Sequence, residues 1–389
     1  MSIDRWGQRL WQKLPAAQRA AFFGCVVTGL LVHLYAFTNL IPNSDGLSRV
    51  YDLQQMTVSG RWFLHYASAL NNFTQMPMAI GLLSLVLLGL AAGLTADLLN
   101  IHSALLGGLS GAVMAAFPCL GYAFLYMFTA SAYCLSILLA VLSVWLARRG
   151  KAGWLLGVLA LALSMGTYQA YVTVAIGLSL LVVLKETLDP GATLKGTWKL
   201  GLRLVGVLVA GAVLYYAILL VFLKVKNLEL LSYLGMDAAS SGYPLSQLPR
   251  LVLDAYKQVI SFFFLPGAAN AFATPLLAVI DLLALALGAA CFLFRLRAGE
   301  LGRELWRPLG ALAMLALLPL GINFGQLLSP YNPPTPLMKY AFAAVYLAVI
   351  LLLQRADEVS ARERGLLARG AAVWAAVLLL FCLQRPDVL

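Results

Sequence analysis

The chain has 389 residues, of which 62% are hydrophobic and only 11% are charged. Soluble domains carry about 45–50% apolar and about 25% charged residues, so this composition excludes a soluble enzyme, a nucleic-acid-binding protein and a disulfide scaffold. The formal net charge of +11 therefore indicates membrane topology rather than a nucleic-acid partner.

The first predicted element is a cytoplasmic amphipathic helix within residues 1–19. Trp6, Leu10, Trp11 and Leu14 recur at helical spacing between basic residues. This pattern is typical of a helix that lies in the membrane interface with its basic face toward anionic headgroups. No small-residue cleavage site follows the next apolar stretch, so we expect an uncleaved helix rather than a signal peptide.

Apolar runs of the length that crosses a bilayer core, about 20 residues, recur along the rest of the chain. We predict eleven transmembrane helices, at residues 20–41, 76–97, 101–117, 121–147, 153–168, 170–185, 200–223, 271–294, 308–326, 339–354 and 370–384. The short spans, especially 153–168, 170–185 and 370–384, are expected to be broken or partly buried. The predicted fold is an all-α polytopic membrane protein, with interfacial helices in its outer loops.

The distribution of basic residues predicts the orientation of these spans, because Lys and Arg concentrate in cytoplasmic loops. With a cytoplasmic N-terminus, 19 of the 27 Lys and Arg residues fall in inside segments. The other eight fall outside: Arg49, Arg61, Lys224, Lys226, Arg250, Lys257, Lys339 and Arg385. We therefore predict that the N-terminus is inside and the C-terminus is outside.

The predicted domain organisation is one polytopic domain, residues 20–389, after the N-terminal helix. Its polar residues gather in three outer loops, 42–75, 224–270 and 326–338, whereas the inner loops are short and basic. We therefore expect the functional site on the outer face. Five cysteines form no Cys-x-x-Cys or metal-ligand spacing, so we expect no disulfide framework, metal or cofactor.

The first outer loop carries the most informative residues. Pro42–Gly46 predicts a turn, and apolar residues at three- and four-residue spacing after it predict helices along the interface. Ser44 or Asp45 would cap the first of these helices. The same position would present the Asp45 carboxylate at the membrane surface, where it could deprotonate a hydroxyl. Both interpretations of Asp45 stay open on spacing alone.

Two further positions in this loop combine charge with aromatic or acidic neighbours. Arg49 and Asp52 are spaced to pair across a helix surface. In Gly60-Arg61-Trp62, the guanidinium of Arg61 suits phosphate, or else it snorkels to the interface beside the indole of Trp62.

Polar residues within or beside the spans give the remaining candidates for substrate binding. Tyr168-Gln169-Ala170-Tyr171 marks a hairpin tip between two spans, where Tyr168, Gln169 and Tyr171 face either a substrate or the interface. Asp281 lies within a span, and a buried acid there is a functional candidate by default. Lys257 and Lys339 each suit either a lipid phosphate or an interfacial anchor.

Together, Asn43-Ser44-Asp45-Gly46, Gly60-Arg61-Trp62 and Tyr168-Gln169-Ala170-Tyr171 resemble the bacterial O-antigen glucosyltransferase family of Gtr type II. Members of that family look like polytopic glycosyltransferases of the GT-C class. The resemblance in layout covers roughly residues 15–385.

The resemblance implies a specific reaction. Such enzymes take a sugar from an undecaprenyl-phosphate carrier on the periplasmic side of the inner membrane and pass it to a glycan acceptor such as O-antigen. By similarity, Asp45 would be the general base of an inverting displacement, and Arg61, with Arg49, Lys257 or Lys339, would neutralise the phosphate leaving group. Many GT-C enzymes have two adjacent acids here, whereas Gly46 follows Asp45, so the pattern does not favour a metal.

Other functions stay open from the residues themselves. A transporter or flippase of lipid-linked glycans would line a central cavity with charges, and an O-antigen polymerase or ligase would have its large outer loop in the C-terminal half. A purely structural subunit would tolerate replacement of Asp45, Arg61 and Asp281. No glycine-rich phosphate loop is present in the sequence, which disfavours a nucleotide-sugar donor.

Overall fold

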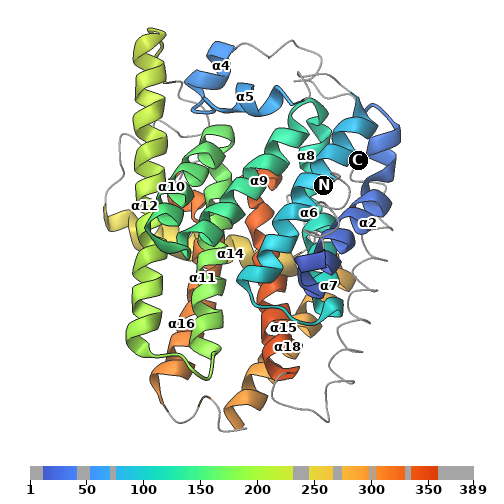
Figure 1. Ribbon diagram of the computed structural model, residues 1–389, viewed down its shortest axis with the longest axis vertical. Helices are drawn as coiled ribbons and strands as arrows, with labels where there is room; N and C mark the ends of the chain where they lie inside the picture. The colour runs from blue at the N-terminus through green and yellow to red at the C-terminus, as the bar shows by residue number, and fades with distance from the viewer. Residues whose placement is uncertain are drawn as a thin grey trace.

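Helices make up nearly all of the regular structure in the computed structural model of the chain (Figure 1). The structure describes residues 12–41, 53–70, 76–230, 245–265, 274–297, 301, 304–328 and 334–357. Every regular element in these ranges is an α-helix or a 3-10 helix. The predicted all-α polytopic membrane fold is therefore confirmed.

Eight helical segments in the described ranges are long and apolar enough to cross a membrane. They are Ala16–Thr38 (α2), Pro77–Leu98 (α6), Met127–Ala147 (α9), Gly150–Thr167 (α10), Gln169–Leu188 (η1, Gln169–Tyr171, with α11, Val172–Leu188), Leu194–Val225 (α12), Pro275–Arg297 (α15) and Pro336–Ala356 (η3, Pro336–Ala343, with α18, Ala344–Asp357). A ninth is the bent pair Ala104–Ala116 (α7) and Pro118–Leu125 (α8), and Trp306–Ile322 (α16) is a shorter apolar helix. These ten segments correspond to ten of the eleven predicted spans, and the eleventh, 370–384, lies outside the described residues.

The break between α7 and α8 follows from Pro118. The residue before a proline is pushed out of the helical region, and Phe117 is extended, with φ −60° and ψ 125°. The two helices consequently meet at an angle of 46°. The expectation of short spans at 153–168 and 170–185 was wrong about length, because α10 and η1–α11 extend beyond those bounds at their Arg149 and Asp189 ends. Partial burial is confirmed for η1–α11, in which 78% of the apolar window lies inside the protein.

The first three spans pack through small residues. A side chain at Gly24 of α2 would overlap the carbonyl of Gly108 on α7, and one at Gly111 would overlap the carbonyl of Ala21. Backbones can approach this closely only where no Cβ intervenes, and such contacts are a main source of helix association in lipid. These glycines therefore set the spacing of α2 and α7.

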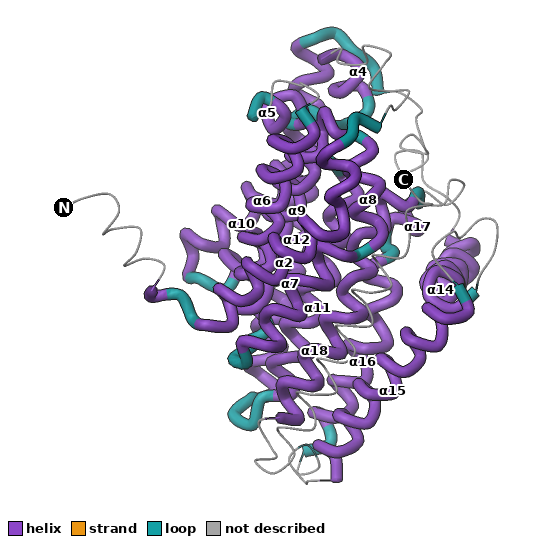
Figure 2. The backbone as a smooth tube through the Cα atoms, turned by 90° about the vertical axis from the view of Figure 1, so that its right-hand side faces the viewer, coloured by secondary structure: helices purple, strands orange, loops and turns teal. Residues whose placement is uncertain are grey.

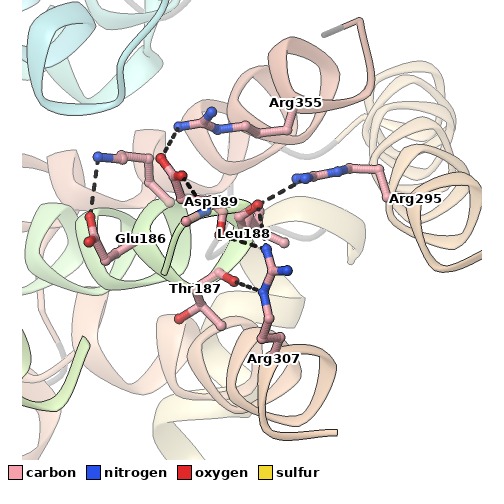
Figure 3. Close-up of polar contacts among 9 residues, drawn as sticks. Glu186, Thr187, Leu188, Asp189, Arg295, Arg307 and Arg355 are labelled. Carbon is pink, nitrogen blue, oxygen red and sulfur yellow. Dashed lines mark hydrogen bonds and ion pairs between the residues drawn. The ribbon is translucent and has the colours of Figure 1, made fainter. Parts of the chain in front are cut away.

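The C-terminal end of α11 is held by arginine side chains from two other helices (Figure 3). Arg307 of α16 donates through Nε to the carbonyl of Thr187 (3.2 Å), and through Nη2 to those of Leu188 (3.2 Å) and Asp189 (2.6 Å). Arg295 of α15 donates through Nη2 to the carbonyl of Leu188 (2.9 Å). The last carbonyls of a helix lack partners within the helix, so these cations satisfy them and match the negative end of the helix dipole.

A third buried arginine reaches the same place from α18. The Nη2 atom of Arg355 lies 4.0 Å from Oδ2 of Asp189, and only 4% of the Arg355 surface is exposed. The three arginines, Arg295, Arg307 and Arg355, are called the arginine hub below. It joins α15, α16 and α18 to one helix end.

Two short helices lie at the opposite end of the bundle from the arginine hub (Figure 1). They are Leu53–Val58 (α4) and Leu64–Ser68 (α5), both within the predicted outer loop 42–75. Leu248–Phe264 (α14) runs across the bundle and is seen end-on in Figure 2. The remaining short elements are Leu245–Gln247 (η2) and Gly325–Leu328 (α17).

Replacing Gly111 by alanine should destabilise the fold by about 1–3 kcal/mol, because the added methyl group collides with the backbone of α2. The midpoint of thermal unfolding of the purified protein in detergent measures this effect. Gly121→Ala in α8 is the control, since a Cβ there meets no atom within 4 Å. Equal unfolding midpoints for the two variants would contradict the proposed close packing.

Replacing Arg307 by lysine should also lower the unfolding midpoint, because one ammonium cannot reproduce a fork that serves three carbonyls. Each buried acceptor left without a donor costs about 1–3 kcal/mol. Arg250→Lys is the matched control, since 85% of the Arg250 side chain is exposed. If both variants unfold like the parent, the arginine hub does not stabilise the end of α11.

Candidate active site

The predicted Gly60-Arg61-Trp62 motif forms the tight turn between α4 and α5. Gly60 has φ 79°, a conformation that glycine adopts without steric cost. The backbone N–H of Arg61 donates to the carbonyl of Met56 at 2.8 Å. The turn therefore reverses the chain at the end of α4 and fixes where the Arg61 side chain begins.

Two polar side chains from different helices hold this turn in place. Nε2 of Gln169 donates to the carbonyl of Ser59 at 2.8 Å, and the hydroxyl of Tyr215 on α12 donates to the carbonyl of Gly60 at 3.1 Å. The predicted hairpin tip between α10 and η1 thus binds the first outer loop, although the two are about 110 residues apart in sequence. Gln169 acts here as a clamp on the turn.

Trp62 points into the protein rather than into the interface. Its indole is only 5% exposed and stacks against Phe222 and Tyr215 of α12, with ring centroids 5.8 and 6.5 Å away. A Cβ at Gly166 of α10 would lie 2.6 Å from the indole ring, so glycine is the residue that admits the ring. The inward position of Trp62 leaves Arg61 as the accessible member of the motif.

Arg61 is half-buried at the surface of the turn. Its Nε donates to the hydroxyl of Ser59 at 3.0 Å, which directs the guanidinium. Its two Nη groups have no acceptor among the described residues. A half-buried guanidinium with donors to spare can take two oxygens of a phosphate or carboxylate.

Four tyrosines form a cluster beneath the turn. Tyr168 lies 5.1 Å, between ring centroids, from both Tyr133 of α9 and Tyr171 of η1, and Tyr171 lies 6.3 Å from Tyr340 of η3. The hydroxyl of Tyr340 donates to the carbonyl of Met114 at 2.8 Å. This tyrosine cluster brings α9, η1 and η3 together next to the docked turn.

Lys339 stands beside the tyrosine cluster on η3. This 3-10 helix spans eight residues, Pro336–Ala343, although such helices are usually limited to three or four. Lys339 is half-buried and forms no ion pair with any residue that the structure describes. Lys339 is therefore a half-buried cation near the start of this span.

Asp281 connects to the same region through aromatic rings. Tyr340 contacts Phe117 and Phe117 contacts Tyr346, at 6.1 and 6.2 Å between centroids. The hydroxyl of Tyr346 on α18 then donates to Oδ1 of Asp281 at 2.7 Å. Asp281 itself is 2% exposed, so this intramembrane acid is buried against the far end of the aromatic chain.

Lys257 is placed differently from the other candidates. Its side chain is 65% exposed on α14, and its Nζ lies 3.9 Å from Oδ1 of Asp254. Arg250 approaches the other oxygen of the same carboxylate at 3.8 Å. Exposed pairs of this kind contribute little energy, and the structure does not bring Lys257 into contact with the tyrosine cluster.

Three of the predicted residues, Asp45, Arg49 and Asp52, lie outside the described residues, as does the N-terminal segment 1–11. The residues that sequence reasoning missed are Tyr133, Tyr215, Tyr340 and Tyr346. Tyr133, Tyr215 and Tyr346 stand within long apolar runs, and Tyr340 follows Lys339 at the start of one. Tyrosines at such positions are expected as interfacial belt residues. Only the fold shows that they converge.

The sequence matches the family model described as Glucosyl transferase GtrII over residues 34–353. The match begins within α2 and ends within α18, so it includes every described candidate residue. Comparisons with curated proteins and with solved structures give no match. With its apolar bundle and this match over most of its length, the chain belongs to the GtrII glucosyl transferase family.

Proposed function

We propose that this multi-pass glucosyl transferase takes its sugar from a polyprenyl-phosphate carrier and transfers it to a cell-surface glycan, such as O-antigen, on the outer side of the bacterial inner membrane. The observation that carries the proposal is the hydrogen bond from Gln169, which lies between Tyr168 and Tyr171 of the tyrosine cluster, to Ser59 in the Arg61 turn. It brings a half-buried cation, Arg61, to the end of the bundle that carries η1, and η3, which carries the half-buried Lys339, packs against η1.

The distribution of arginines supports an outer location for this site. The arginine hub lies at the end of the bundle opposite α4 and α5 (Figure 1). Basic residues concentrate on the cytoplasmic side of membrane proteins, which supports a periplasmic position for the end that carries α4 and α5. A donor at that end arrives through the bilayer on a lipid carrier.

Arg61 and Lys339 fit the phosphate of such a donor better than Lys257 does. Both are half-buried, and neither forms an ion pair with a described residue, whereas Lys257 is exposed and pairs with Asp254. Cations in a partly desolvated site stabilise a departing phosphate more strongly than exposed ones. We assign Arg61 and Lys339 to the phosphate, and Tyr168 and Tyr171 to the wall beside the sugar.

In the proposed reaction, Asp45 takes the proton from a hydroxyl of the acceptor glycan. The resulting oxygen attacks the anomeric carbon of the sugar, and the bond from that carbon to the phosphate oxygen breaks. The electron pair leaves with polyprenyl phosphate, and the anomeric centre inverts. Arg49 and Asp52 belong to the same loop and would contact the substrates beside Asp45.

Asp45→Asn should lower transfer by about 10²–10⁴-fold, the usual contribution of a general base. Transfer of radiolabelled glucose from its polyprenyl-phosphate carrier to a lipid-linked glycan, by purified protein, measures the loss. Binding of the donor should persist in the variant. Full transfer by Asp45→Asn would remove Asp45 from the role of base.

Arg61→Lys and Lys339→Gln should each raise the KM for the donor by about 10-fold or more, because charge-assisted hydrogen bonds to the phosphate are lost. Arg250→Gln is the matched control, an exposed cation on α14 that should leave KM and kcat unchanged. Unchanged KM values in Arg61→Lys and Lys339→Gln would place the phosphate elsewhere.

A further inference from the structure

The helix that follows the Arg61 turn, α5, presents aromatic side chains on its outer surface. The exposed fraction of Tyr66 is 51%, and its ring stacks against that of the half-buried Phe63, with centroids 6.0 Å apart and 30° between the ring planes. The ring of His65 meets that of Tyr66 edge-on, at 5.6 Å between centroids. Phe63, His65 and Tyr66 are called the aromatic face of α5 below.

The opposite side of α5 is held against the protein. Leu64, Ala67 and Ser68 are buried, and α5 packs against α9 and α10. The backbone N–H of Phe63 donates to the carbonyl of Gly166, the residue before the last one of α10, at 2.7 Å. Isolated helices of fewer than about 12 residues are marginal in water, so these contacts keep the five-residue α5 formed and hold its aromatic face in a fixed position.

The position of α5 turns this face away from the bundle. Figures 1 and 2 both show α5 at the end of the molecule opposite the arginine hub. Its buried side covers the end of α10 at Gly166. The exposed ring of Tyr66, on the other side, is therefore accessible from beyond the ends of the helices.

Exposed aromatic rings at this end suit either the membrane interface or a carbohydrate, and two observations favour the carbohydrate. The largest ring of the segment, Trp62, is the one best suited to anchor a helix in the interface, but it is buried. The large apolar side chains that are exposed on the spans α15 and α16 are all leucine or valine. The surface of α5 thus differs from these apolar spans by being aromatic.

The chemistry of the aromatic face matches that of a sugar ring, which combines apolar C–H faces with hydroxyl groups at its edges. Stacked rings offer a flat apolar surface. The hydroxyl of Tyr66 and the ring nitrogens of His65 are polar groups at the edges of that surface. Aromatic walls with a small number of polar groups that fix orientation are the usual composition of a ligand site.

We propose that the aromatic face of α5 binds the acceptor glycan, with a sugar ring packed on Tyr66 beside Phe63. This inference rests on the proposed function and adds the surface that recognises the acceptor: the Arg61 turn binds the donor, and the helix directly after it binds the glycan. Because the glycan is a chain of sugars, one unit can lie on Tyr66 while a neighbouring unit brings its hydroxyl to the donor.

The test measures the KM of each substrate separately, in transfer of glucose from its polyprenyl-phosphate carrier to lipid-linked O-antigen by the purified full-length protein. Tyr66→Ala should raise the KM for the acceptor by about 10-fold, the loss expected when a stacked ring is removed, and leave the KM for the donor unchanged. Tyr66→Phe keeps the ring and should retain most of the affinity for the acceptor. Phe63→Leu keeps the apolar volume but not the flat ring, and should also raise the KM for the acceptor.

Tyr35→Ala is the matched control. Tyr35 is 61% exposed and lies in the last turn of the span α2, so its replacement should leave both KM values unchanged. Because Tyr66 is exposed, Tyr66→Ala should unfold at the same temperature as the wild type. If Tyr66→Ala and Tyr35→Ala change the two KM values alike, or change neither, the aromatic face lies in lipid and the inference is overturned.

A binding measurement without donor separates this inference from the proposed donor. The probe is O-antigen glycan released from its lipid. Loss of affinity for it in Tyr66→Ala supports the inference even if polyprenyl-phosphate glucose proves not to be the donor. If the wild type uses that donor and Tyr66→Ala binds the released glycan as the wild type does, the inference is overturned and the donor stands. If the wild type does not bind the released glycan, the acceptor assignment fails and this inference fails with it.

Discussion

A helix end in a bilayer has no water to satisfy its last carbonyls, so its partners must come from the protein. At the end of α11 they come from arginines on α15 and α16, while an arginine of α18 faces the neighbouring Asp189. α11 packs against α9, α12, α16 and α18, which makes it the central post of the bundle. Its opposite end, about 25 Å away, carries η1 and the tyrosine cluster. The arginine hub thus fixes one end of α11, and the length of α11 sets the distance from the hub to the candidate site.

The spans could be predicted from the sequence because lipid imposes both length and composition on them. Hydropathy located ten helical segments. The limits of α10, η1–α11 and α12 were harder to predict: α12 begins at Leu194 and takes in Lys195 and Lys199, whereas the predicted span begins at residue 200. Arg203, within the helix, donates to carbonyls at the α9–α10 connection. In a sequence, charged residues are taken to mark the end of a membrane span, but here the helix continues through them.

The candidate site was predictable only in part. The sequence singled out Arg61 and Gln169, and the fold joins their loops by a hydrogen bond from Gln169 to Ser59. It did not indicate that Trp62 turns inward, because that depends on the space above Gly166 and on the rings of α12. The aromatic chain to Asp281 draws on rings from several elements. Contacts of this kind are set by tertiary packing, and the local spacing of residues in the sequence does not predict them.

The eight-residue 3-10 helix η3 has a mechanical consequence for the mouth of the last described span. A 3-10 helix rises about 2.0 Å per residue, against 1.5 Å in an α-helix. Winding Pro336–Ala343 into α-helix would therefore shorten the segment by about 4 Å and rotate Lys339 relative to Tyr340. The segment can therefore change its length along the helix axis, and because α18 follows it directly, the rewound residues would extend α18 at its start. A change of winding at this one point would raise or lower a cation at the membrane surface without moving the bundle.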